Sequence, residues 1–280
     1  MNPVGEIMDD ADSERGRNNS SRTRVLPVFA ALERRTDDWV RALLDLADIG
    51  DPYCCSSGRW STLRLLPTAV SFADRQSDRR ERSFKPPRAL LRWLIENASP
   101  GPGQELSSDP ETRKLRERLL INREESARDQ AFRDLETGGQ TARWCTLEGP
   151  TYPDVVIETP DALVIVEGKF TERGPTTHTT WMSGRHQMLR HLDGAWEARG
   201  ERAVFGIFAV EGEDPDPRRV PVKWQIASRH TRSIAATEGS LPHRSVEDRR
   251  AIADALVGVV TWQAVADGFE LPAGILTPRL

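Results

Sequence analysis

Three residues near the middle of the chain, Asp154, Glu167 and Lys169, have side chains that could together do chemistry. Two alternating apolar runs flank a Thr-Pro-Asp-Ala break between them, and this pattern predicts a β-hairpin. A turn centred between Pro160 and Asp161 would place Asp154 directly opposite Glu167. Because side chains along a strand alternate between its two faces, all three residues should project from one face of the hairpin.

The two opposed carboxylates would lie roughly 5 Å apart at their Cβ atoms, where like charges repel. A divalent cation between them would remove the repulsion, and Mg²⁺ is commonly held by one or two carboxylates together with substrate phosphate oxygens. The hairpin therefore predicts a site for Mg²⁺ (or Mn²⁺). The alternative is a surface hairpin on which Lys169 merely neutralises Glu167.

The same residues resemble a known motif. Pro153-Asp154, a spacer and Glu167-Gly168-Lys169 resemble the PD-(D/E)xK signature of the restriction-endonuclease-like nuclease superfamily. This resemblance implies that Asp154, Glu167 and the carbonyl of Gly168 bind the metal, and that Lys169 positions and activates the attacking water. It also implies an α/β fold with a mixed central sheet, flanked by helices, in the order αβββαβ.

A helix is expected from about residue 108 to 137, since a capping sequence opens it and two glycines end it. Its apolar positions centre close to Glu124, and an acid within a buried stripe is costly without a partner. Many members of the resembled superfamily carry a Glu on the helix before the first core strand as an additional metal ligand, so we assign that role to Glu124. Glu117 lies nearly as central, and Glu125 is the weaker alternative. An acid at the end of a helix that packs only partway along would give the same pattern.

A second helix is expected from about residue 181 to 199. Arg185 falls on its apolar stripe, while Gln187 and His191 share a different face at spacing i, i+4. The segment from Gln187 to His191 resembles the Q-x-x-x-Y element of RecB-like members of the superfamily, with His in place of Tyr. The resemblance implies a catalytic role for Gln187 and a nucleic-acid contact for His191. If the protein is a nuclease, Arg185 or Gln187 would hold the phosphate. The alternative is an exposed polar face.

A basic segment precedes these elements. Nine basic and three acidic residues lie between Arg59 and Arg92, an excess of six positive charges in a chain whose net charge is −4. Such a segment could follow a phosphate backbone, with Arg79, Arg80 and Arg82 as the expected contacts. A solvated face with local salt bridges is the alternative.

The remaining patterns suggest how the chain is organised. We expect a disordered tail at 1–23, a helical and partly basic region at 24–104, and a nuclease-like domain at 105–280 that ends in a helix. Further expected elements are a first core strand at 142–147, a strand buried on both faces at 203–210, a strand at 222–227 and the C-terminal helix at 245–265.

Composition narrows the function classes. The chain has 280 residues and a net charge of −4, so it does not resemble a basic protein that coats nucleic acid. Its three cysteines form no paired framework, which favours a reduced, cytoplasmic setting, and no apolar run is long enough to span a membrane. The sequence predicts a metal-dependent nuclease with DNA as the expected substrate, and a protein partner or homo-oligomer is compatible with this. The alternatives are a catalytically silent module that binds nucleic acid or protein, and a metal-assisted hydrolase with another substrate.

Overall fold

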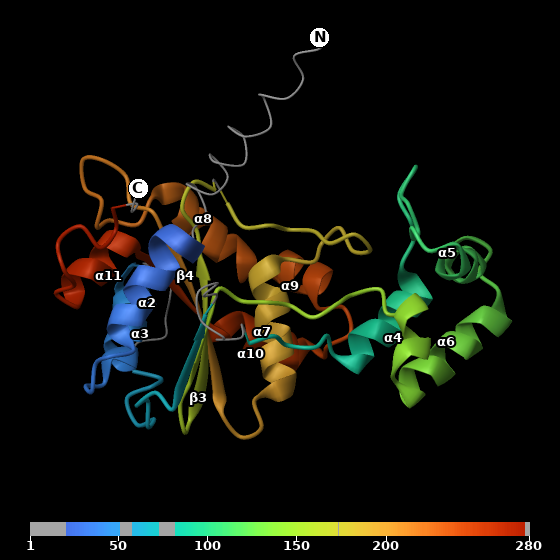
Figure 1. Cartoon of the computed structure of the whole chain (residues 1–280), viewed down its shortest axis with the longest axis horizontal. Coiled ribbons are helices and arrows are strands. Elements are labelled where there is room, and N and C mark those ends of the chain that lie inside the picture. The colour runs from blue at the N-terminus through green and yellow to red at the C-terminus, as the bar shows by residue number, and fades with distance from the viewer. Residues whose placement is uncertain (1–20, 51–57, 73–81, 173, 278–280) are drawn as a thin grey trace, which may run out of the picture.

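The computed structural model describes residues 21–50, 58–72, 82–172 and 174–277. Most of the predicted tail, and the predicted phosphate contacts Arg79 and Arg80, lie outside the described residues. Within them the chain forms a five-stranded mixed sheet with helices on both faces (Figure 1). The strands follow one another in chain order: β1 Ala69–Phe72, β2 Val155–Glu158, β3 Ala162–Gly168, β4 Ala203–Val210 and β5 Leu256–Thr261.

The predicted hairpin is β2 and β3. These strands pair antiparallel with Val155 opposite Val166, which is the register expected from the sequence. Thr159 holds the turn: its backbone N–H donates to the Ala162 carbonyl at 2.9 Å, and its Oγ1 accepts from the Ala162 N–H at 2.8 Å. β1 also pairs antiparallel with β2, whereas β3, β4 and β5 run parallel to one another.

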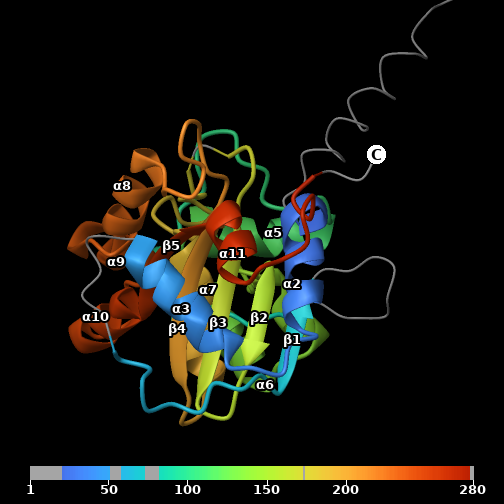
Figure 2. The ribbon, with the colours of Figure 1, turned by 90° about the vertical axis from the view of Figure 1, so that its left-hand side faces the viewer.

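Both faces of the sheet are covered. Every residue of β3 is buried, because its alternate side chains enter two different apolar cores. One core lies under the helices on the left of Figure 1: α2 Leu26–Leu32, α3 Trp39–Gly50 and α11 Trp262–Gly268. Figure 2 shows α3 crossing the strands. The other core lies under α7 Gln187–Ala198, α8 Val222–Thr231 and α10 Val246–Ala255, with the short α9 Ile234–Ser240 beside them.

The expected division of the chain at residue 104 does not match the sheet. The N-terminal helices, which are separated at 33–38, pack on the sheet and share its core. β1, from the same N-terminal region, is hydrogen-bonded to β2. The N-terminal region as far as β1 is therefore part of the sheet domain, whereas α4 Arg88–Asn97 belongs to a separate core.

A helical lobe, residues 88–144, is inserted between β1 and β2. Its own apolar core is separate from the two cores of the sheet, and it lies at the far right of Figure 1. At the base of the lobe, Phe84 and Thr151 exchange two backbone hydrogen bonds of 3.0 and 2.9 Å. We call this pair of residues the neck. The lobe consists of α4 Arg88–Asn97, α5 Pro110–Arg116, the π-helical turn η2 Glu117–Ile121, α6 Glu125–Thr137 and the 3₁₀ turn η3 Gln140–Trp144.

Several sequence-based expectations were wrong. The strand expected at 142–147 is replaced by η3 and a following irregular segment, and the helix expected at 108–137 is broken around Arg123, whose φ is +54°. The segment at 222–227 is helical, and the expected C-terminal helix is two helices, α10 and α11, separated by β5. β5 is buried along its whole length, and a short apolar run of this kind has no period that separates strand from helix.

The expected α/β class, with a mixed sheet flanked by helices, is confirmed. The expected order helix, strand, strand, strand, helix, strand does not occur in succession along the chain; it is found, as α3, β1, β2, β3, α7 and β4, only when the helical lobe is left out. The first strand of that order is β1, and the lobe separates it from β2 in the chain. No helix in the described ranges has the length and apolar character needed to cross a bilayer.

Candidate active site

Asp154, Glu167 and Lys169 come together at the carboxyl end of β3. The Lys169 Nζ lies 2.8 Å from Glu167 Oε1, as expected for two side chains on the same face of a strand. Asp154, which precedes β2, accepts a hydrogen bond of 2.8 Å from the Gly168 backbone N–H. The sequence-based prediction that these residues meet is confirmed.

Glu167 and Lys169 form a buried ion pair. Their side chains are 3% and 10% exposed, respectively. Burial by itself raises the pKa of the Glu167 carboxyl, but His191 and the Lys169 ammonium outweigh it and hold this pKa below its usual value. Burial lowers the pKa of Lys169, but the neighbouring carboxylates, Glu167 foremost, raise it above its usual value. Both side chains are therefore ionised at neutral pH.

Helix α7 presents two further side chains to this pair. Gln187 Oε1 accepts a hydrogen bond from Lys169 Nζ at 3.1 Å, and His191 Nε2 lies 3.1 Å from Glu167 Oε2. The helical spacing of i, i+4 thus matches the spacing of i, i+2 on the strand, so each helix residue meets one strand residue. His191 is only 2% exposed, which places it beneath the surface.

Thr151 was not identified from the sequence. Its Oγ1 lies 2.6 Å from His191 Nδ1, on the side of the ring away from Glu167. Nothing in the local pattern singles out this residue, because the contact depends on how α7 crosses the hairpin. Trp262, at the start of α11, is a second such residue: its Nε1 donates to the Lys169 carbonyl at 3.0 Å.

Gly168, between Glu167 and Lys169, lies against the helices on the opposite face of the sheet. A Cβ at this position would be 2.8 Å from Val25 Cγ2 and 3.0 Å from the Trp262 ring, so only glycine lets the opposite helical layer approach. The same Cβ would be 3.4 Å from Asp154 Oδ2, which shows how close that carboxylate lies to the strand backbone.

The residues present fit a hard divalent cation. Two carboxylates, Asp154 and Glu167, supply the oxygen ligands that Mg²⁺ and Mn²⁺ prefer. Glu167 Oε2 is fully buried and makes no well-aligned hydrogen bond with any described residue. The described residues include no cluster of three or more His, Cys, Asp or Glu side chains with metal-site geometry. A cation here would therefore complete its shell with a backbone carbonyl, water or substrate oxygens.

Arg185 does not face a substrate, contrary to the sequence-based expectation. Its side chain is fully buried and forms ion pairs of 2.9 Å with both Glu148 and Asp193. Its remaining nitrogen donates to the Ser240 carbonyl at 2.8 Å. With all its nitrogens bonded inside the protein, Arg185 has none left for a phosphate.

The helix-borne metal ligand was also assigned wrongly. Glu124 precedes α6 in the helical lobe, is 36% exposed and pairs with Arg118 at 2.7 Å; the hydrogen bond from Arg118 lowers its pKa. Glu117 and Glu125, the alternatives, belong to the same lobe, which Figure 1 shows far from β3. The predicted apolar stripe assumed one unbroken helix, and the break at Arg123 turns Glu124 away.

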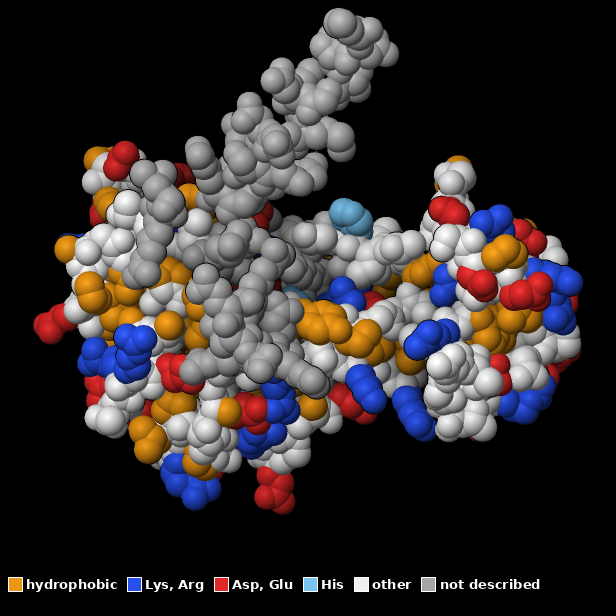
Figure 3. Space-filling view, viewed as in Figure 1, with side chains coloured by type: hydrophobic (Ala, Val, Ile, Leu, Met, Phe, Trp, Pro, Cys, Tyr) orange, Lys and Arg blue, Asp and Glu red, His pale blue; other side chains and the backbone are white. Residues whose placement is uncertain are grey.

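Several basic residues in the described part of the basic segment are paired with acids, among them Arg64 with Asp161 and Arg92 with Glu136. Arg82 forms an ion pair with Glu158, which also pairs with Arg202 at 3.0 Å. Glu158 ends β2 and Asp154 precedes its start, so Arg82 lies roughly 13 Å along the strand from the carboxylate pair. On the face seen in Figure 3, Lys and Arg are interspersed with Asp and Glu. These observations favour the salt-bridged face over a phosphate track for Arg82.

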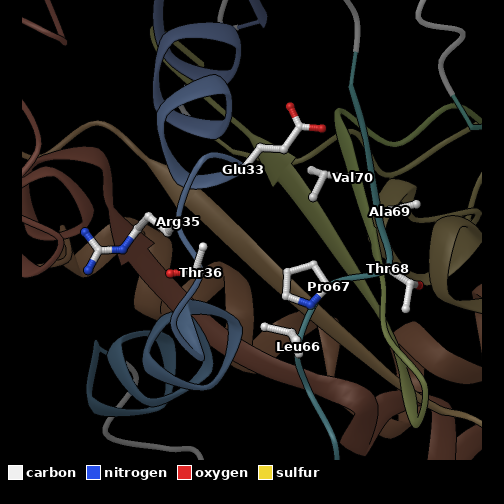
Figure 4. Close-up of a pocket in the computed structure, with 8 residues that line it drawn as sticks. All are labelled: Glu33, Arg35, Thr36, Leu66, Pro67, Thr68, Ala69 and Val70. Atoms are coloured by element: carbon white, nitrogen blue, oxygen red, sulfur yellow. The ribbon is translucent and has the colours of Figure 1, made fainter.

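A small surface pocket of about 390 Å³ lies at the β1 edge of the sheet, between the end of α2 and β1 (Figure 4). Its charged residues are Glu33 and Arg35, and Arg35 is paired with Asp37 at 2.6 Å. None of the site residues described above lines this pocket. The convergence of charged groups at β3 is therefore the stronger candidate site.

Comparison with protein-family models, with curated proteins and with solved structures finds no match to this chain.

Proposed function

We propose that this protein is a metal-dependent nuclease of the PD-(D/E)xK type with a restriction-endonuclease-like core. One observation carries the proposal: Asp154 from one arm of the hairpin, and Glu167 and Lys169 from the other, converge on one strand end beside Gln187. A buried Lys between a Glu and a Gln amide is costly to build and has no packing role of its own. The order of α3, β1–β3, α7 and β4 is consistent with the same superfamily.

In this proposal Asp154, Glu167 and the Gly168 carbonyl hold Mg²⁺ or Mn²⁺. When bound, the metal would act as a Lewis acid on the scissile phosphate and on a water. Lys169 would hold the attacking water and stabilise charge that develops at the phosphate. Gln187 would keep the Lys169 ammonium in place through its 3.1 Å hydrogen bond. DNA is the proposed substrate.

A second candidate is a module of the same fold that binds nucleic acid or protein without cutting. It is favoured by the close Lys169–Glu167 pair of 2.8 Å, in which the two charges already neutralise each other. A cation must compete with this pairing for Glu167. The two candidates agree on the architecture and differ on whether Lys169 turns toward a substrate.

One assay separates the candidates. The purified chain is incubated with labelled duplex, single-stranded and branched DNA and with RNA, in Mg²⁺, in Mn²⁺ and in EDTA. The nuclease proposal expects cleavage of at least one substrate that requires metal and is lost in Asp154→Asn, a variant that keeps a side-chain acceptor for the Gly168 N–H. Metal and nucleic-acid binding without any cleavage would overturn it and favour the binding module.

A further inference from the structure

Glu167 is contacted from the helix side by a chain of buried polar residues. We propose that Thr151 and His191 are positioning residues: Thr151 fixes the tautomer of His191, and His191 orients the Glu167 carboxylate for a divalent cation. This inference rests on the proposed function only in taking Glu167 as a metal ligand. It replaces the expectation that His191 contacts nucleic acid.

The distances select one tautomer. Only one hydrogen can lie between Thr151 Oγ1 and His191 Nδ1, which are 2.6 Å apart. In the neutral imidazole only one ring nitrogen carries a hydrogen, so if Nδ1 carried it, the bare Nε2 lone pair would face Glu167 Oε2 at 3.1 Å, and two electron-rich atoms would repel. If Thr151 donates to Nδ1, then Nε2 carries its hydrogen toward the carboxylate, and the contact is attractive. In metal sites the tautomer of a histidine is set in this way, by the bond that its other nitrogen makes.

The contact between Glu167 and His191 is short, but its hydrogen-bond angle is poor. Glu167 Oε2 and His191 Nε2 are both fully buried, and neither has a well-aligned hydrogen bond with a described residue. Oε1 of the same carboxylate is held by Lys169. Oε2 is thus the oxygen that can turn toward a cation while the imidazole N–H stays beside it.

Thr151 is itself held in place. Its backbone N–H and carbonyl are both bonded to Phe84 in the neck, and its side chain is buried. Phe84 in turn lies against α7 at Gly194. The hydroxyl therefore meets His191 at a fixed position, and the orientation of Glu167 depends on the neck of the helical lobe.

A second threonine–histidine contact provides a matched control. Thr231 Oγ1 lies 3.0 Å from His186 Nε2, and both residues are buried. Among the described residues His186 forms no ion pair with a carboxylate, in contrast to His191. Thr231 Oγ1 also donates to the Ala227 carbonyl at 2.8 Å, so removing this hydroxyl removes a buried threonine–histidine contact and one further hydrogen bond without touching Glu167.

The test uses Thr151→Val, which keeps the shape and removes the hydroxyl, with Thr151→Ser and Thr231→Val as controls. Mn²⁺ affinity is measured by calorimetry on the full chain, beside melting temperature. Loss of a bond that orients a metal ligand costs about 10- to 100-fold in affinity. We expect Thr151→Val to bind Mn²⁺ at least about tenfold more weakly, while Thr151→Ser and Thr231→Val bind like the wild type.

A spectroscopic measurement separates positioning from general damage. Nitrogen-15 spectra of the histidine rings should give His191 as the Nε2–H tautomer in the wild type and a mixture in Thr151→Val. If Thr151→Val does not fold, His191→Gln, which keeps a side-chain N–H, should bind Mn²⁺ more tightly than His191→Leu. Equal Mn²⁺ affinity in wild type and Thr151→Val, an Nδ1–H tautomer of His191, or a wild type that binds no Mn²⁺ would each overturn the inference.

Failure of the inference and failure of the nuclease proposal give different results. A wild type that never cleaves nucleic acid, yet loses Mn²⁺ affinity in Thr151→Val, supports the positioning role and overturns the nuclease. A wild type that cleaves, with unchanged cleavage and Mn²⁺ affinity in Thr151→Val, supports the nuclease and overturns the positioning role.

Discussion

At the scale of single residues, the surroundings of Glu167 differ from those expected of two opposed carboxylates. The hairpin register does place Asp154 and Glu167 at facing positions, but Asp154 bonds to a backbone N–H while Glu167 faces Lys169 and His191. The expected repulsion is therefore offset within the protein before any cation binds. Removing the charge of Glu167 should then destabilise the protein, whereas relieving a repulsion would stabilise it.

Glu167→Gln should destabilise the metal-free protein. It leaves the buried Lys169 ammonium without its charged partner, and breaking one side of a buried pair costs roughly 3 kcal/mol. Asp154→Asn should change stability much less, because the amide keeps an oxygen for the Gly168 N–H. Urea unfolding of both variants in EDTA gives the comparison; equal midpoints for Glu167→Gln and the wild type would show that the pair is not structural.

Lys169→Met tests the catalytic role of the ammonium. The substitution keeps most of the stem and removes the charge, so Mn²⁺ binding should persist while the single-turnover cleavage rate falls by roughly two orders of magnitude. Lys223→Met, at an exposed lysine paired with Glu213, is the matched control and should cut at the wild-type rate. A Lys169→Met protein that cleaves as fast as the control contradicts the assigned role.

At the scale of elements, α7 must lie close to the hairpin for Gln187 and His191 to reach it. Gly194 makes this approach possible where the helix meets the neck. A Cβ at Gly194 would lie 2.7 Å from Phe84 Cβ, which is too close for two carbon atoms and leaves little room to move because Phe84 is bonded to Thr151.

Gly194→Ala should therefore destabilise the protein even though alanine favours the helix by about 1 kcal/mol. Overpacking at a fixed contact costs about 1–3 kcal/mol, so we expect a net loss of about 1 kcal/mol. Gly239→Ala in α9, where a Cβ would meet only ordinary contacts at 3.7 Å, should be neutral or slightly stabilising. Thermal or urea unfolding of the two variants gives the sign of each change in the free energy of unfolding. A stabilised Gly194→Ala would show that Phe84 can move away from the added methyl group.

At the scale of the whole molecule, a buried ionic network joins three parts of the chain. Arg185 bonds to Glu148, which lies between the helical lobe and β2, and to Asp193 on α7. Asp193 also pairs with Arg244, which precedes α10, at 2.9 Å and lies 3.3 Å from His243 Nε2. The arginine expected to bind phosphate thus connects the segment that leads from the lobe to β2 with the helices that cover the sheet.

This network makes stability depend on acid pH. Burial raises the pKa of Asp193, but the hydrogen bond from His243 and the charges of Arg185 and Arg244 outweigh it and lower this pKa to about 2. A carboxyl whose pKa falls on folding stabilises the native state above its unfolded pKa, near 4. That contribution, about 2 kcal/mol for a shift of this size, is lost as pH falls from about 4 to 2.

Asp193→Asn should accordingly lower the free energy of unfolding at pH 7 and flatten its fall between pH 4 and 2. Urea titrations at several pH values measure both effects. The exposed Asp37, whose pKa is lowered by its hydrogen bond with Arg35, is the control position: Asp37→Asn should change stability little, because a surface pair contributes little. If the free energy of unfolding fell with pH in the same way in Asp193→Asn and the wild type, Asp193 would not be the source of the acid dependence.

The sequence by itself determined the features that depend on neighbours in the chain. Alternation of apolar residues and the Thr-Pro-Asp-Ala turn set the hairpin register, so Asp154, Glu167 and Lys169 could be placed together. Helical spacing put Gln187 and His191 on one face, and both do meet the hairpin. These features follow from local periods of two and 3.6 residues, which the sequence displays directly.

Tertiary structure alone decided which partner each element found. The first strand is β1, whose pairing with β2 spans the whole helical lobe, and no local pattern records that pairing. Arg185 lies on the apolar stripe of α7, but only the positions of Glu148 and Asp193 decide that it is buried and paired. Glu124 and Thr151 were misjudged or missed for the same reason. Burial and polar contacts between distant segments are set by the packing of whole elements, which outweighs the local preference of any one residue.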